Sequence, residues 1–310
     1  MDQPNAIALA KPARLPSAQS PTRRMLRRLL HHRSAQIGLV ILVFMALVAI
    51  FADVLAPYAY DEQVEDANAK RRDPPCVHIL GCDPSKPQFV FGLDSNKRDL
   101  FSRVIYGSRL SLEIGFITSG FAIVIGALLG AVAGYAGGWT DNIIMRTMDV
   151  LLAFPSLLLA IAIVSVLGPG LVNTLLAVGI VSIPVYARIV RASVLSVKEM
   201  EYVDASRALG ASSARILFTR LLPNSLTPLI VQGTLGIGTT ILEAAGLSFL
   251  GLGAQPPLPE WGLMLGDERN SVFNAPHLLI FPGLAIMITV LGFNLIGDGL
   301  RDALDPRRAA

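Results

Sequence analysis

The sequence predicts an all-α, polytopic membrane protein with six transmembrane helices. Hydrophobic residues make up 53% of the 310-residue chain and charged residues 16%, whereas an average soluble domain carries about 25% charge. The mean hydropathy is +0.56. The apolar residues fall in several uncharged runs long enough to cross a bilayer, which takes about 20 residues of helix. The net charge of +3 is too small to indicate a nucleic-acid partner.

Residues 1–36 are expected to form a cytoplasmic tail and a basic amphipathic segment. The first 22 residues are rich in Pro, Ala, Ser and Gln, a composition typical of disorder. Arginines and leucines then alternate between Arg23 and Arg33, so a helix there would lie on the anionic inner surface of a membrane. Residues 37–56 form the first predicted span. A cleaved signal peptide is the alternative, and it fits poorly because the apolar run is long.

Residues 57–107 form a long polar loop of mixed charge, which we expect outside the membrane. The loop holds the two cysteines of the sequence, Cys76 and Cys82. In an oxidising compartment these cysteines are expected to form a local disulfide. Two free thiols are one alternative, and a metal site that includes His78 is another. Because no pair of histidines has metal-site spacing together with a cysteine or carboxylate, we expect no metal site.

Residues 108–300 form the expected core domain with five further transmembrane helices. The first of these carries glycines at spacings that let helix backbones approach closely in lipid. Pro155 lies inside the third helix of the chain, and the fourth is expected to break near Pro184. The glycines are Gly115, Gly120, Gly126, Gly130 and Gly134. The five helices are expected over about residues 110–133, 143–167, 171–190, 226–249 and 278–296.

The charges of the connecting segments predict the orientation. Six spans place both termini on the same side of the membrane. The basic N-terminal segment, the arginine-containing stretch 188–223 and the tail 301–310 then face the cytoplasm, where basic residues concentrate. The long loop with its acidic residues faces outward.

The loop at about residues 199–223 is the most informative polar segment. Residues 203–209 favour a short helix with small side chains on one face. Gly210 ends this helix because glycine accepts the left-handed conformation of a helix stop. Ser212 is expected to cap a second short helix, which Pro223 breaks before the fifth span. Such a protruding helix fits a groove on another protein, and an ordinary connecting loop is the alternative.

The same loop resembles the EAA loop of bacterial binding-protein-dependent ABC importers. That pattern reads Glu-Ala-Ala, three residues, Gly, nine residues, Ile, one residue, Leu-Pro. The chain departs from it with Asp204 for Glu, Ser206 for the second Ala and Arg220 for Ile. The residues that align with the ATPase-coupling segment are Asp204, Ala205, Ser206, Arg207, Gly210, Leu222 and Pro223.

Further blocks are similar to permeases of the dipeptide, oligopeptide and nickel branch of this family. They include residues 186–192, 243–253, 255–257, 261–262, 294–302 and 304–307. The resemblance implies a type I ABC importer permease fold in the bacterial inner membrane, with this chain as the C-type permease of a heterodimer. The implied partners are a second permease subunit, two ABC ATPase subunits, a periplasmic or lipid-anchored substrate-binding protein and membrane lipid.

The chain lacks the motif that hydrolyses ATP in P-loop proteins. That motif requires a lysine directly after a glycine, so that the lysine reaches the phosphates. None of the lysines of this sequence follows a glycine. We therefore expect no enzyme activity and no cofactor in this chain, with ATP and Mg bound by the partner ATPase subunits.

Three polar residues in or near apolar runs are candidates for the translocation path: Asp149, Glu243 and Asn294. Polar groups at membrane depth usually face a bundle interior or a cavity. A structural role is the alternative, above all for Asp149, which is expected to pair with Arg146. Di- and oligopeptides are the expected substrates, with nickel or another peptide-like solute as alternatives. An ion-coupled secondary transporter is the rival function, although it would require a carboxylate relay and an internal repeat.

Overall fold

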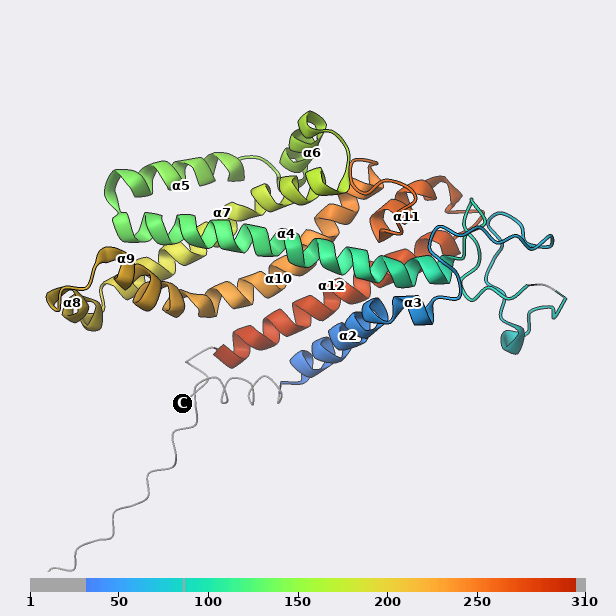
Figure 1. The fold of residues 1–310 in the computed structure, drawn as a ribbon, viewed down its shortest axis with the longest axis horizontal. Helices are drawn as coiled ribbons and strands as arrows, with labels where there is room; N and C mark the ends of the chain where they lie inside the picture. Colours follow the sequence, from blue (N-terminus) through green and yellow to red (C-terminus); the bar gives the residue numbers. More distant parts are fainter. Residues whose placement is uncertain (1–31, 86, 305–310) are drawn as a thin grey trace, which may run out of the picture.

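The computed structural model describes residues 32–85 and 87–304. Long helices run side by side in a bundle (Figure 1). These helices are α2 (Arg33–Ile50), α4 (Leu100–Ala136), α7 (Leu171–Lys198), α10 (Leu222–Phe249) and α12 (His277–Leu304). The shorter elements are α3 (Ala52–Leu55), η1 (His78–Leu80), α5 (Gly138–Leu152), α6 (Ser156–Leu167), α8 (Glu201–Ala208), α9 (Ser213–Ile216), η2 (Leu217–Leu221), α11 (Trp261–Asp267) and η3 (Arg269–Ser271).

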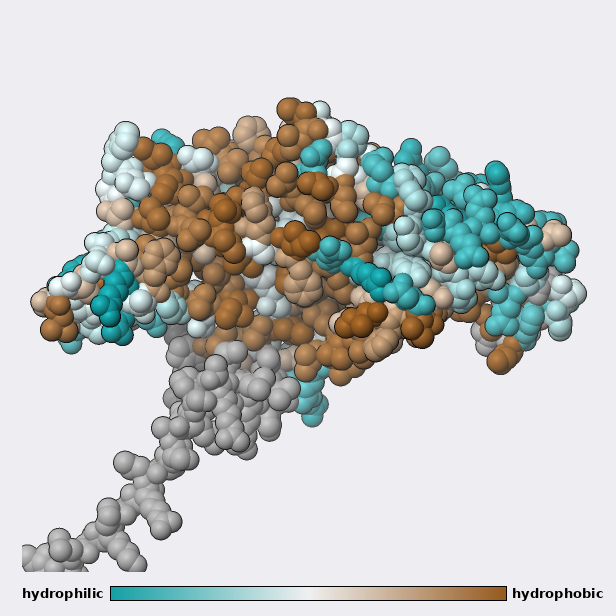
Figure 2. Space-filling view, in the orientation of Figure 1, coloured by the Kyte–Doolittle hydropathy of each residue, from teal (hydrophilic) through white to brown (hydrophobic). Residues whose placement is uncertain are grey.

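The two ends of the bundle differ in structure and polarity. α8 and α9 project at one end, which we call the α8 end (Figure 1). The segment before α4 and the segment around α11 gather at the other, which we call the loop end. Figure 2 shows hydrophobic side chains over the middle of the bundle and hydrophilic ones at the loop end. An apolar band between polar ends is expected where helices satisfy their own backbone hydrogen bonds inside a bilayer.

The predicted number of spans is confirmed, with one of them broken. Five helices of the described chain are long and apolar enough to cross a membrane, and α5 with α6 makes a sixth if this pair crosses as one span. The pair is bent by 93°. The third span, predicted over about residues 143–167 with Pro155 inside it, is therefore two helices and not one. Pro155 disfavours a helical conformation at the residue before it, so α5 ends at Leu152 and a new helix begins at Ser156.

Two other predicted breaks are absent. α7 continues from Leu171 to Lys198 with Pro184 inside it, because neighbouring helices in a membrane bundle can satisfy the backbone group that proline frees. Pro223 lies in the first turn of α10, where its missing N–H is not needed by the helix. The π-helical turn η2 joins α9 directly to α10.

Glycines let α4 pack closely against α7. A Cβ at Gly126 would lie 2.8 Å from a backbone carbonyl oxygen of α7, and one at Gly134 would lie 3.0 Å from another. A Cβ at Gly130 would clash with the carbonyl oxygen of Ala187. Gly120, in contrast, has no atom within 4 Å of that position. The predicted glycine seam therefore exists, and Gly120 lies outside it.

α2 packs along α12. A Cβ at Gly38 would lie 2.8 Å from the carbonyl oxygen of Gly292. His32 Nε2 lies 3.0 Å from a carboxylate oxygen of Asp302. The start of α2 and the end of α12 thus lie at the same end of the bundle, as an even number of spans requires. The predicted amphipathic stretch up to residue 31 and the tail after residue 304 lie outside the described residues.

Candidate functional site

The first candidate site is the exposed turn formed by α8 and α9. Val203 is the buried residue of α8, and it packs into the same apolar cluster as side chains of α4 and α7. Asp204 and Ala205 are exposed and Ser206 is half-buried. Leu209, directly after the helix, is 88% exposed. One side chain therefore anchors α8 while its small residues remain on the surface.

Backbone geometry closes the turn sharply. Gly210 has φ +81° and no atom within 4 Å of the position of a Cβ, so its conformation, not crowding, calls for glycine. Its N–H donates to the carbonyl of Arg207 at 2.9 Å, and the N–H of Ala211 donates to that of Ser206 at 3.1 Å. Ser212 Oγ accepts a hydrogen bond from the backbone N–H three residues later at 3.4 Å. The predicted glycine stop and serine cap are both observed.

A hydrogen bond links α8 to the start of α10. Asn224 Nδ2 donates to Tyr202 Oη at 3.1 Å and to the carbonyl of Arg220 at 2.6 Å. Leu222 is half-buried and Pro223 is exposed in the first turn of α10. α9, η2 and α10 follow one another without a gap, so the turn is joined directly to a long helix of the bundle.

A hollow of about 490 Å³ lies beside this turn. Ser206, Gly210 and Thr219 line it, and Arg215 and Arg220 add two positive charges. The hollow is large enough to receive side chains of another protein, and its charges favour acidic ones.

The second candidate site is a cavity of about 230 Å³ between the α5–α6 junction, α7 and α10. Glu243 of α10 lies in its wall, and Glu243 Oε1 accepts a hydrogen bond from Ser156 Oγ at 2.8 Å. Gln232, Gly236 and Thr239 also line it. Steps of three and four residues place these positions and Glu243 on one face of α10. One of the three predicted path residues therefore faces a cavity.

The other two predicted path residues lie elsewhere. Asp149 does not form the expected pair with Arg146. Its carboxylate instead lies 2.5 Å from a guanidinium nitrogen of Arg188, because α7 runs beside α5 and brings its arginine across. Asn294 is exposed on α12 and is not among the residues that line the cavity.

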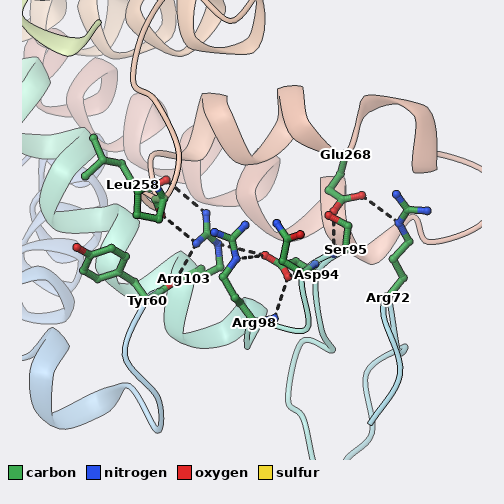
Figure 3. Close-up of polar contacts among 10 residues, drawn as sticks. Tyr60, Arg72, Asp94, Ser95, Arg98, Arg103, Leu258 and Glu268 are labelled. Carbon is green, nitrogen blue, oxygen red and sulfur yellow. Dashed lines mark hydrogen bonds and ion pairs between the residues drawn. The ribbon is translucent and has the colours of Figure 1, made fainter. Parts of the chain in front are cut away.

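A buried ionic network joins the segment before α4 to the segment after α10 (Figure 3). Arg103 is 2% exposed. Its guanidinium donates to the backbone carbonyls of Tyr60 at 2.8 Å and Leu258 at 3.3 Å. Asp94 lies 3.6 Å from Arg103 and forms a 2.7 Å ion pair with Arg98. These contacts hold the loop end as one structured unit.

Two glutamates accept further hydrogen bonds at the loop end. Glu268 accepts hydrogen bonds from Arg72 Nε at 3.2 Å and from the backbone N–H of Ser95 at 2.9 Å (Figure 3). Glu260 accepts from two backbone N–H groups at the start of α11, at 2.9 and 2.7 Å. Burial raises the pKa of the Glu260 carboxyl, and these donors partly oppose that shift.

A disulfide closes a short loop in the segment before α4. Cys76 and Cys82 are bonded, with Cα atoms 5.4 Å apart. The backbone of Cys76 also exchanges hydrogen bonds with Phe89 at 2.8 and 2.9 Å. In this bonded form neither cysteine supplies the thiolate that a metal would need.

Comparison with known proteins identifies the family. A family model described as "Binding-protein-dependent transport system inner membrane component" matches residues 126–310. The chain belongs to this family. A second family model, described as "N-terminal TM domain of oligopeptide transport permease C", matches residues 20–75 of the permease.

Curated relatives support the same assignment over nearly the whole chain. The permease is 49% identical to the dipeptide transport system permease protein DppC of Alkalihalophilus pseudofirmus, over 94% of this chain and 91% of the relative. It is 46% identical to the glutathione transport system permease protein GsiD of Pectobacterium atrosepticum, over 94% and 93%. It is 45% identical to the di/tripeptide transport system permease protein DppC of Pseudomonas aeruginosa, over 93% of each. The predicted family is confirmed, and it is one of membrane permeases, not of enzymes.

The fold of the permease is also found among solved structures. A chain of the MetNI methionine ABC transporter, in an inward-facing conformation, matches with a TM-score of 0.54 at 20% identity, over 66% of this chain and 98% of that chain. A second structure of that transporter gives a TM-score of 0.55. The predicted ABC importer permease fold is confirmed.

Two residues of the cavity, and Arg103 of the loop-end network, were not predicted. Ser156 was signalled by Pro155 before it, since proline inside an apolar run marks the start of a new helix. Gln232 was signalled by its spacing of four residues from Gly236 on the Glu243 face. Arg103 left no such signal, because its carbonyl partners lie 43 and 155 residues away in the chain.

Proposed function

We propose that this permease is the C-type transmembrane subunit of an ATP-driven importer and forms half of the translocation path for di- and oligopeptides. The names of its relatives support this substrate class, since they transport dipeptides, di- and tripeptides, or the peptide glutathione. The 45–49% identities extend along almost the entire chain, so the regions that contact substrate and partners are included.

The exposed α8 turn carries the proposal of ATPase coupling. The turn exposes small residues that can fit closely against another protein, and α8 is held by one buried side chain, Val203. We assign the docking to Asp204, Ala205, Ser206, Arg207 and Gly210, with Leu222 and Pro223 starting the helix that receives the motion. The hydrogen bond between Asn224 and Tyr202 supports this mechanical connection.

The proposal includes the partners and the orientation. A second permease subunit completes the path, two ABC ATPase subunits hold ATP and Mg, and a periplasmic or lipid-anchored binding protein delivers the peptide. The bacterial inner membrane surrounds the bundle, with both termini in the cytoplasm. In support, His32 and Asp302 meet at one end of the bundle, which is also the end of α8 (Figure 1).

Co-purification tests the docking assignment. The tagged permease is extracted in mild detergent, and the proteins that accompany it are identified for wild type and for Gly210→Arg. The variant should retain the second permease and lose the ATPase, because arginine both strains the left-handed turn and adds bulk to the docking face. Gly251→Arg is the matched control, since Gly251 also has φ +81° and open space around it but follows α10 at the other end.

Uptake measurements complete this test. Wild-type importer in liposomes should accumulate peptide only with ATP, with a dipeptide, glutathione and a nickel chelate compared as substrates. A Gly210→Arg variant that keeps the ATPase and normal uptake would disprove the assignment. A permease that purifies alone and moves solute along an ion gradient would instead be a secondary transporter.

A further inference from the structure

The cavity beside the α5–α6 break contains a carboxylate whose observed partner is neutral. Glu243 accepts its hydrogen bond from Ser156, a hydroxyl group. The arginines of α7 that form ion pairs are already matched: Arg188 pairs with Asp149, and Arg191 pairs with Asp141. Across residues 32–85 and 87–304, no ion pair includes Glu243. A charge at membrane depth calls for a counter-charge, so a cation from outside the described chain fits this position.

Part of the remaining wall of the cavity offers hydrogen-bond acceptors. Ser182 and Thr239 line it, beside apolar side chains such as Val181 and Val185. Each of the two hydroxyls donates to a backbone carbonyl one turn earlier in its own helix, at 2.8 and 3.4 Å respectively. Because each hydroxyl has one proton to donate, the lone pairs are what it offers to a ligand. The cavity therefore suits a group that is cationic and rich in N–H donors.

Size and position narrow the class of ligand further. The volume of about 230 Å³ corresponds to several waters at about 30 Å³ each, which is room for an amino group and one short side chain. Gly236 contributes to this shape, because a Cβ there would clash with the Tyr186 hydroxyl in the opposite wall. Glu243 lies six residues before the end of α10, or about 9 Å from the loop end of that helix.

We propose that this cavity binds the α-ammonium group of a peptide in transit, with Glu243 as its counter-charge. The inference rests on the proposed function, because di- and oligopeptides present a free amino group at one end. The ammonium donates to the carboxylate and to the hydroxyl oxygens of α7 and α10. Ser156 keeps the carboxylate turned toward the cavity from the start of α6.

Thiol labelling measures this binding without the delivery protein. The whole importer is reconstituted in nanodiscs with Val185→Cys in the permease, which leaves the proposed hydroxyl ligands in place, and maleimide labelling is followed on that chain. Its two native cysteines are disulfide-bonded, so the introduced thiol, which replaces an exposed cavity residue, provides the signal. Alanyl-alaninamide carries the ammonium without a carboxylate, and N-acetyl-alanyl-alaninamide is its neutral counterpart. We expect the cationic peptide to protect the thiol at an about tenfold lower concentration.

Variants separate the charge from the shape of the site. Glu243→Gln should abolish the difference between the two peptides while keeping an acceptor for Ser156. Glu243→Asp retains the charge and should preserve the difference. Asp149→Asn removes a carboxylate from the neighbouring α5, outside the cavity lining, and should also leave the difference intact.

The following results would contradict the ammonium site. Equal protection by both peptides, or by neither, excludes an ammonium site. Loss of the second permease on purification of Glu243→Gln would show that a basic residue of that subunit is the counter-charge. ATP-driven peptide uptake by the wild type is measured in parallel. Failure of that uptake rejects the proposed function, whereas uptake without charge-dependent protection rejects the ammonium site alone.

Discussion

Single side chains hold the loop end together through contacts distant in sequence. Arg103 lies in the first turn of the long helix α4, yet its guanidinium binds carbonyls of two separate segments and lies near Asp94. At 2% exposure the charge has little access to water, so each missing partner would leave a buried donor unsatisfied. Arg103 therefore ties two segments of the loop end to α4.

Replacement of Arg103 by alanine should strongly destabilise the permease. Removing one member of a buried ionic network costs about 3–5 kcal/mol, because Asp94 would then lose a partner. Arg109→Ala is the control, since the Arg109 side chain is 45% exposed in its pair with Asp53 and exposed ion pairs contribute little to stability. Thermal unfolding of the detergent-solubilised protein measures both. Equal shifts in Tm would contradict the central role of Arg103.

Helix packing depends on where glycines meet a neighbouring backbone. The seam between α4 and α7 uses Gly126, Gly130 and Gly134, whose missing side chains let carbonyl oxygens of α7 approach. Close approach is what drives helix association in lipid, where burial of apolar surface adds little. Gly120 lies on the same helix without such a neighbour.

Alanine substitutions should separate these two kinds of glycine. Gly130→Ala should destabilise the fold by about 1–3 kcal/mol, because the new methyl group overlaps the carbonyl of Ala187 and the helices must move apart. Gly120→Ala should be neutral or stabilising by up to about 1 kcal/mol, since alanine favours helix. Chemical unfolding in mixed micelles compares the two variants. Similar stabilities would show that the seam is looser than the structure indicates.

The whole molecule has two chemically different ends, and its function requires them on opposite sides of the membrane. Leu209 is 88% exposed at the α8 end and Phe273 is 96% exposed at the loop end. Together with the disulfide at the loop end, this arrangement suits an oxidising outer side and a reducing inner side.

Cysteine labelling from each side of the membrane tests this orientation. With an impermeant maleimide, Phe273→Cys should react in intact spheroplasts and Leu209→Cys only in inside-out vesicles. The native pair Cys76–Cys82 is bonded and serves as the unreactive background in the parent protein. Labelling of both variants from one side would show that α10 does not cross the membrane, and the reverse pattern would contradict the proposed orientation.

The sequence by itself determined the all-α class, the approximate spans and the turn at Gly210. These features depend on the length of an apolar run or on the backbone preference of a single residue. Apolar segments of about 20 residues must be helical in lipid, which sets the all-α class and the span count. The left-handed stop at Gly210 and the cap at Ser212 follow from the residues themselves. The family resemblance, carried by the loop around Asp204 and by the blocks before and after it, extends this to function.

Only the tertiary structure decided which prolines bend a helix, which charged residues pair and which polar residue faces a cavity. Pro155 bends the third span by 93°, whereas Pro184 leaves α7 continuous, because the effect of a proline depends on which neighbours satisfy the freed backbone. Asp149 pairs with Arg188 and not with nearby Arg146, since packing of α5 on α7 brings the distant arginine closer. Likewise Glu243 was visible as a polar residue, but only folding placed Ser156 and a cavity beside it.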